Sequence, residues 1–144
     1  MIARSEGDLA EVLPKSPAGI LTTMPRVAVV RASNYGAGLG DPARFANAKQ
    51  VYRLSGLVPT LYESAGRKRP RSHLSREGRV ELREAILELG RALKDGHPDF
   101  ALYAARLAER GKEPGVVACA LGNRANRVAF KMVRDQLPFD PARW

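Results

Sequence analysis

Apolar residues recur three or four positions apart through the last part of the chain, which is the spacing of one face of an α-helix. Three such stripes predict three helices, over about residues 79–94, 99–110 and 114–136. Gly and Pro residues separate them, and Pro138 ends the last one. The inward-facing positions are Leu82, Ile86, Leu89 and Leu93, then Phe100, Tyr103, Ala104 and Leu107, and finally Val117, Leu121, Ala125, Val128 and Met132.

The first part of the chain predicts shorter helices that proline and glycine interrupt. Residues 57–74 have no helical period, and Pro59 and Pro70 lie within them. Residues 57–62 are compatible with an extended conformation, and we expect an exposed basic loop for the rest. The short helices cover about residues 5–13, 18–24, 28–39 and 46–55.

These patterns predict an all-α fold, a compact bundle of five to six helices. A chain of 144 residues is long enough to bury a core without disulfides or metals. We expect an N-terminal helix and linker at 1–17, followed by one domain at 18–144. Within that domain we expect a hairpin of helices at 18–42, a basic loop at 57–78 and a helical core at 79–137.

The single cysteine and the lack of long apolar runs argue against a disulfide-bonded or membrane-spanning protein. Cys119 stands alone in an apolar run, so a small buried hydrophobe is the better interpretation than a nucleophile. No apolar run approaches the roughly 20 residues of a membrane span, and the N-terminus lacks a signal-peptide pattern. We therefore expect a cytoplasmic location and no membrane partner.

Charge points to an anionic partner. Lys and Arg number 24 against 15 acids, a net charge of +9. Nucleic acid is the usual partner of so basic a domain. Between positions 67 and 83, seven basic residues face two acids, which places +5 of the charge in one short segment: Arg67, Lys68, Arg69, Arg71, Arg76, Arg79 and Arg83.

A turn at Pro25 to Ala28 joins two predicted helices and resembles a helix-hairpin-helix. In that motif two glycines let backbone N–H groups meet a DNA phosphate. Arg26 and Ala28 occupy the glycine positions here, so we expect the Arg26 side chain to contact phosphate. A plain packing corner between two helices is the alternative.

A series of short motifs runs in order along the chain, from Pro25 to Ala28, through Gly40-Asp41, Arg44-Phe45, Gly56 to Pro59, Glu63 to Gly66 and Leu74 to Gly78, to Leu82-Arg83. Their order and spacing resemble the C-terminal transposase domain of the insertion sequence 110 family. These enzymes are bridge-RNA-guided serine transposases related to Piv-type DNA invertases. The resemblance covers most of the chain, from about Ile20 onward.

The resemblance implies a serine nucleophile at Ser64, which would attack a DNA phosphodiester in the complete enzyme. The basic residues downstream of Ser64 would stabilise the charged transition state. The family has serine and glycine where Glu63 and Ala65 stand here. The alternative is that Ser64 only caps a turn. Ser75 is a poorer candidate because its position suits a helix N-cap.

The resemblance also implies partners outside this domain. Family members carry an N-terminal RuvC-like domain whose acidic residues hold magnesium, and they use a guide RNA and assemble as homo-oligomers. His73 and His97 have no metal-ligand spacing, so we expect no metal or other cofactor in this chain and no DNA cleavage by it alone.

Three functions remain open at this point. The first is a DNA-binding transposase domain whose catalytic status is uncertain. The second is a non-catalytic nucleic-acid-binding helical protein or an inactive transposase remnant. A helical protein–protein adaptor is the third, and the concentrated positive charge argues against it.

Overall fold

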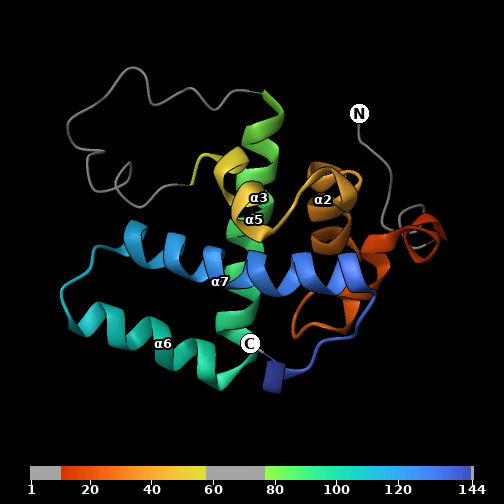
Figure 1. Ribbon diagram of the computed structural model, residues 1–144. Helices are drawn as coiled ribbons and strands as arrows, with labels where there is room; N and C mark the ends of the chain where they lie inside the picture. Colours follow the sequence, from red (N-terminus) through yellow and green to blue (C-terminus); the bar gives the residue numbers. More distant parts are fainter. Residues whose placement is uncertain (1–10, 58–76, 144) are drawn as a thin grey trace.

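The two longest helices of the computed structural model, α5 (Glu77–Gly96) and α7 (Pro114–Asp135), cross near its centre (Figure 1). The structure describes residues 11–57 and 77–143. Around the crossing lie α2 (Val29–Leu39), α3 (Ala48–Ser55), α6 (Pro98–Glu109) and the short 3₁₀ helices η1 (Leu13–Lys15), η2 (Pro17–Thr23), η3 (Pro42–Arg44) and η6 (Pro141–Arg143). All regular secondary structure in the described residues is helical, which confirms the all-α prediction.

Two glycines let α5 and α7 approach closely. A Cβ atom on Gly90 of α5 would lie 2.9 Å from the backbone nitrogen of Gly122 on α7. A Cβ on Gly122 would lie 3.0 Å from the Cγ2 atom of Ile86. Larger side chains at either position would force the helix axes apart, because close-packed interiors have no space to spare.

The predicted apolar stripe of α5 is confirmed, since Leu82, Ile86, Leu89 and Leu93 are all fully buried. On α7 the stripe was only partly right. Val117 and Val128 lie half-buried at its edge. The true buried face is wider and also includes Val116, Cys119, Gly122, Asn126, Ala129, Phe130 and Val133.

A buried network of hydrogen bonds joins the three helices α2, α3 and α7. The hydroxyl of Tyr35 on α2 donates to Oδ1 of Asn126 at 2.8 Å, and Nδ2 of Asn126 donates to the carbonyl of Ala48 at 2.9 Å. Tyr35 and Asn126 are both fully buried. Because an unsatisfied buried polar group is costly, this mutual pairing fixes how α2, α3 and α7 meet.

The segment predicted as a helix at 18–24 is η2, a 3₁₀ helix rather than an α-helix. The hydroxyls of Thr22 and Thr23 donate to carbonyls three residues earlier, and Met24 ends the helix in an extended conformation. The helix predicted from residue 46 begins instead at Ala48, because the Asn47 side chain accepts a hydrogen bond from the Gln50 amide.

The helix α3 ends at Ser55, as predicted, and Gly56 follows it in the left-handed conformation. No helix among the described residues is long and apolar enough to cross a membrane.

Candidate nucleic-acid interface

The turn between η2 and α2 has the shape that a glycine would adopt most easily. Arg26 is exposed and has a φ of 62°, in the left-handed region that non-glycine residues rarely enter. The amide of Val27 donates to the carbonyl of Met24 at 3.2 Å and tightens the turn. The backbone thus keeps a glycine-type conformation although the residue is arginine.

Contacts from α5 and α2 hold this turn in place. A Cβ on Gly96 would lie 2.7 Å from the Cγ atom of Arg26, so Gly96 makes the room that the turn occupies. Nη1 of Arg31 donates to the Arg26 carbonyl at 2.9 Å, and Nη2 of Arg31 forms an ion pair with Glu88 at 3.1 Å. Glu88 also pairs with Arg91 at 2.8 Å. The turn is therefore positioned by charged side chains of both helices.

The first turn of α2 follows directly. Ala28 is its N-cap residue and makes no side-chain capping bond. The first backbone N–H to donate a helical hydrogen bond is that of Ala32, which donates to the Ala28 carbonyl at 3.1 Å. The N–H groups before it have no intrahelical acceptor, and such groups at a helix N-terminus attract anions.

The predicted nucleophile Ser64 lies outside the described residues, and so do Arg67, Lys68, Arg69, Arg71 and Arg76. Of the other predicted contacts, Arg26 lies at the turn and Arg79 lies in the first turn of α5. The serine segment connects α3 to α5. At its start, Leu57 is fully buried and its amide donates to Oγ of Ser55 at 3.2 Å.

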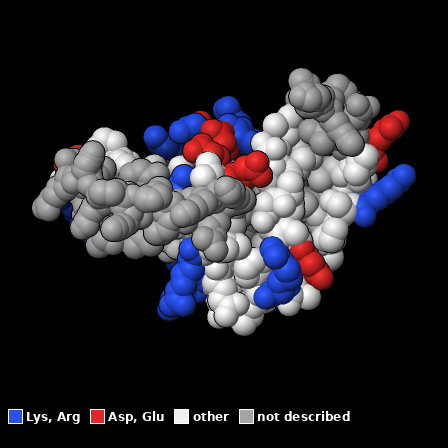
Figure 2. Space-filling view, turned by 90° about the horizontal axis from the view of Figure 1, so that it is seen from above, with Lys and Arg blue, Asp and Glu red and all other residues white. Residues whose placement is uncertain are grey.

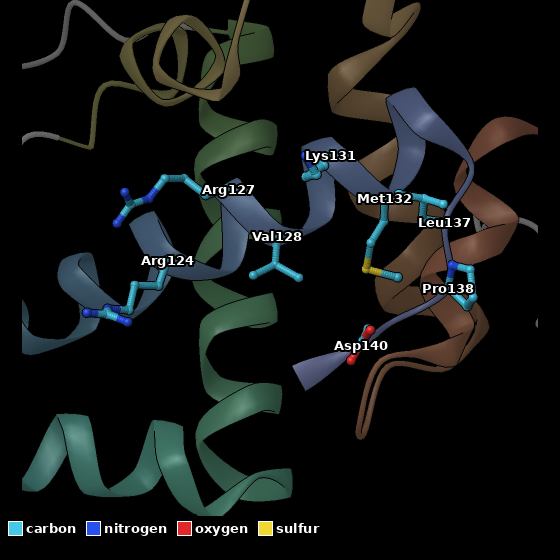
Figure 3. A pocket seen from close by; sticks show the side chains of 8 residues that line it. All are labelled: Arg124, Arg127, Val128, Lys131, Met132, Leu137, Pro138 and Asp140. Atoms are coloured by element: carbon cyan, nitrogen blue, oxygen red, sulfur yellow. The ribbon is translucent and has the colours of Figure 1, made fainter. Parts of the chain in front are cut away.

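Sequence reasoning missed a basic face on α7. Arg124, Arg127 and Lys131 line one side of a pocket of about 280 Å³, which continues over Val128 and Met132 to Leu137, Pro138 and Asp140 (Figure 3). The spacing of three and four residues between the basic positions is the signal that reveals this face.

Viewed from above, the described surface carries basic side chains along its edges, with acidic side chains among them (Figure 2). This mixed pattern differs from the sequence between positions 67 and 83, where seven basic residues face two acids. The basic residues that are candidates for binding must therefore be told apart by their local contacts.

The remaining chemistry-bearing residues have structural roles. Cys119 is buried, as predicted, and burial raises the pKa of its thiol to about 11. His97 caps α6, because its Nδ1 atom accepts a hydrogen bond from the Asp99 amide at 3.2 Å. Within residues 11–57 and 77–143, no three His, Cys, Asp or Glu side chains are grouped so that they could hold a metal ion.

Fold and surface thus define an all-helical, basic domain. The sequence profile described as the transposase IS116/IS110/IS902 family matches residues 18–105, and the chain belongs to this family. The resemblance seen in the motifs is thereby confirmed.

Two curated relatives agree with this assignment. An insertion element IS110 uncharacterized 43.6 kDa protein of Streptomyces coelicolor is 32% identical over 127 residues, covering 88% of this chain and 31% of the relative. The transposase for insertion sequence element IS1328 of Yersinia enterocolitica is 30% identical over 116 residues, covering 76% and 34% respectively. The chain thus spans about a third of the length of these relatives. No solved structure matches it.

Proposed function

We propose that this chain is the DNA-binding domain of a transposase that acts in DNA transposition, with Ser64 as the residue that attacks DNA in the complete enzyme. The observation that carries the proposal is the family match over residues 18–105, because it spans both the Arg26 turn and the segment with Ser64. The net charge of +9 supports an anionic partner.

In the reaction, the Oγ atom of Ser64 attacks phosphorus and forms a phosphoserine ester. The bond from phosphorus to the 3′ oxygen breaks, and that oxygen leaves as a 3′ hydroxyl after taking up a proton. The serine proton passes to water. Arg67, Lys68 and Arg69 follow Ser64 closely in sequence, and their positive charge would stabilise the transition state.

The Arg26 turn supplies a second contact with the DNA backbone. The Arg26 side chain is exposed, and the free N–H groups of the first turn of α2 lie directly after it. A phosphate at this point would accept hydrogen bonds from both the guanidinium and the helix end.

The complete enzyme needs components beyond these residues. We assign magnesium to a RuvC-like domain supplied in cis or in trans, because the described acids form no metal-ligating group. A guide RNA and a homo-oligomeric assembly belong to the same proposal. This chain would contribute binding and the serine.

Trapping of a covalent adduct tests the nucleophile. The chain, fused to a RuvC-like domain of a relative and supplied with magnesium, is expected to form a denaturation-resistant adduct with labelled DNA. Ser64→Ala should abolish that adduct and leave DNA affinity within about twofold, because an isolated hydroxyl contributes little to binding. Ser72→Ala and Ser75→Ala are matched controls that keep the adduct. An adduct that persists in Ser64→Ala would refute the assignment.

Salt dependence tests the binding surface. Replacing Arg67, Lys68 and Arg69 with Ala should reduce the slope of log K against log salt by roughly two to three units, one for each lost phosphate contact. Arg106→Ala is the control, since this exposed residue lies on α6. An unchanged slope in the triple variant would locate DNA binding elsewhere, first at the Arg26 turn.

A second candidate function is a non-catalytic nucleic-acid-binding protein, including an inactive remnant of the transposase. Glu63 favours it, because an acid beside the serine would repel the phosphate that the serine must attack. This candidate predicts salt-sensitive DNA binding with no adduct in the fused wild-type protein. Restoring the adduct by Glu63→Ser would show that the acid is what prevents the reaction.

A further inference from the structure

The pocket on α7 lies beyond residue 105, outside the part of the chain that the family profile matches. We propose that it binds one unpaired nucleotide of a nucleic-acid strand, with the phosphate at its basic side and the base over its apolar floor. This inference rests on the proposed function, because it assumes that the domain binds nucleic acid.

The two sides of the pocket carry opposite charges. Arg124, Arg127 and Lys131 come from successive turns of α7, whereas Asp140 lies across from them in the C-terminal segment (Figure 3). The Ala142 amide donates to Oδ1 of Asp140 at 3.0 Å and so helps to fix its position. A nucleotide has the same polarity, with an anionic phosphate at one end and hydrogen-bonding groups of the base at the other.

The arginines are available for a ligand. Among the described residues Arg127 has no ion-pair partner, and its side chain is exposed. Arg124 lies 4.0 Å from the ring centroid of Tyr103, while its Nε atom is buried without a hydrogen-bond acceptor. Stacking on an aromatic ring holds the guanidinium plane in place and adds no anion.

Lys131 is held only loosely. Its ammonium lies 4.0 Å from Asp135, the outer limit of an ion pair, and Asp135 already binds Arg134 at 2.9 Å. Arg124 and Arg127 extend from α7 toward the same end of the pocket, where their charged donors can contact a phosphate, and Lys131 lies further along the helix (Figure 3).

The apolar floor of the pocket favours a nucleotide over a simple phosphate or a duplex backbone as the ligand. Val128, Met132 and Pro138 present apolar surface between the charged ends. Duplex DNA would offer only phosphates to this side of α7 and leave the floor empty. An unstacked base can fill it, as bases of single strands do against apolar and aromatic side chains. The volume of about 280 Å³ lies near the lower end of small-ligand sites.

Fluorescence anisotropy with short labelled oligonucleotides tests the proposal on the full chain. The probes are a single-stranded DNA, the matching RNA, the DNA duplex and a single strand with abasic sites. Wild type should bind the intact single strand roughly 5- to 150-fold more tightly than the abasic strand, which is the range for one stacked base.

Matched double variants assign the effect to the pocket. Arg127→Ala with Lys131→Ala should weaken single-strand binding at least tenfold and lower the salt slope. Arg106→Ala with Arg110→Ala removes the same charge at the same spacing from two exposed residues, one on α6 and one at its C-terminal cap, and should change affinity less than twofold. Val128→Trp fills the pocket without changing charge, and should remove the preference for intact over abasic strands.

The outcomes separate the two proposals. Failure of wild type to bind any probe would overturn the proposed function together with the pocket. Binding by wild type that is equal in the two double variants would overturn the pocket alone. Equal affinity for intact and abasic strands would overturn the base contact. Tighter binding of either DNA or RNA supports the pocket and identifies which strand it takes.

Discussion

The two faces of α7 differ in the burial and the partners of their polar side chains. On the inner face, Asn126 is fully buried and both ends of its amide are hydrogen-bonded. On the outer face, only one residue away in sequence, Arg127 is exposed and lacks an ion-pair partner among the described residues. One helix thus keeps a hydrogen-bonded polar side chain in the core on one side and an exposed charge on the other. Substitutions on the two sides should then affect different measurements.

Gly122→Leu should have the largest effect, because the added side chain would collide with Ile86 at the crossing of α5 and α7. We expect a loss of about 3 kcal/mol or more in the free energy of unfolding, measured by urea denaturation. Arg127→Leu introduces the same side chain on the outer face and should change stability by less than about 0.5 kcal/mol. Equal losses in the two variants would contradict the division between the faces.

Asn126→Ala should cost about 2 to 3 kcal/mol, because it leaves the buried Tyr35 hydroxyl without its acceptor and removes the donor to Ala48. The control is Asn123→Ala, since Asn123 is a half-buried asparagine of the same helix. Its loss should stay near 0.5 kcal/mol. A neutral Asn126→Ala would mean that the network does not join the helices.

Stability should fall at alkaline pH, because the inner face of α7 also buries Cys119. The unfolded thiol loses its proton near pH 8.5, at about its ordinary value, whereas burial raises the pKa of Cys119 to about 11. Between these values the folded state holds a proton that the unfolded state has lost, so the free energy of unfolding decreases as pH rises. Burial also raises the pKa of Tyr35, which extends the fall above about pH 10.

Denaturant midpoints measured from pH 7 to 10.5 check this expectation. Cys119→Ala should reduce the loss of stability that begins near pH 8.5 and leave unchanged the loss above about pH 10. A curve identical to wild type in that variant would assign the fall to other groups.

Arg127→Ala with Lys131→Ala should have the smallest effect on folding, within about 0.5 kcal/mol, because exposed charges contribute little to stability. Circular dichroism and the urea midpoint check it. A loss above 1 kcal/mol in the free energy of unfolding would show that these outer residues stabilise the fold. The pocket would then be tested with the Val128→Trp protein instead of the double variant.

The fold was predictable where a single period dominates. The stripe of α5 predicted its buried residues because these side chains pack against α7 and α2. The helix breaks at Gly56 and Gly96 followed from glycine and proline positions. The face of α7 was harder to predict. Gly122 and Asn126 are not hydrophobic, yet they are buried, since one admits a neighbouring backbone and the other is fully hydrogen-bonded.

The candidate site was predictable only in part. The Arg26 turn was expected, but sequence alone could not show that the arginine keeps a φ of 62° or that Gly96 makes room for it. Those features depend on how α5 packs against the turn. The basic face of α7 was missed because its charges are spread over several turns and do not form a run.

The fixed start of the serine segment has a consequence for how this domain can evolve. Ser55 and Leu57 secure the chain at the end of α3, and Leu82 is buried early in α5, so the packed core sets both points that the segment must join. The entropic cost of such a connection grows only with the logarithm of its length, about 0.6 kcal/mol for each doubling. Insertions and deletions between these points would therefore cost little folding free energy. Segments of different length could therefore join the same two points of one unchanged helical scaffold.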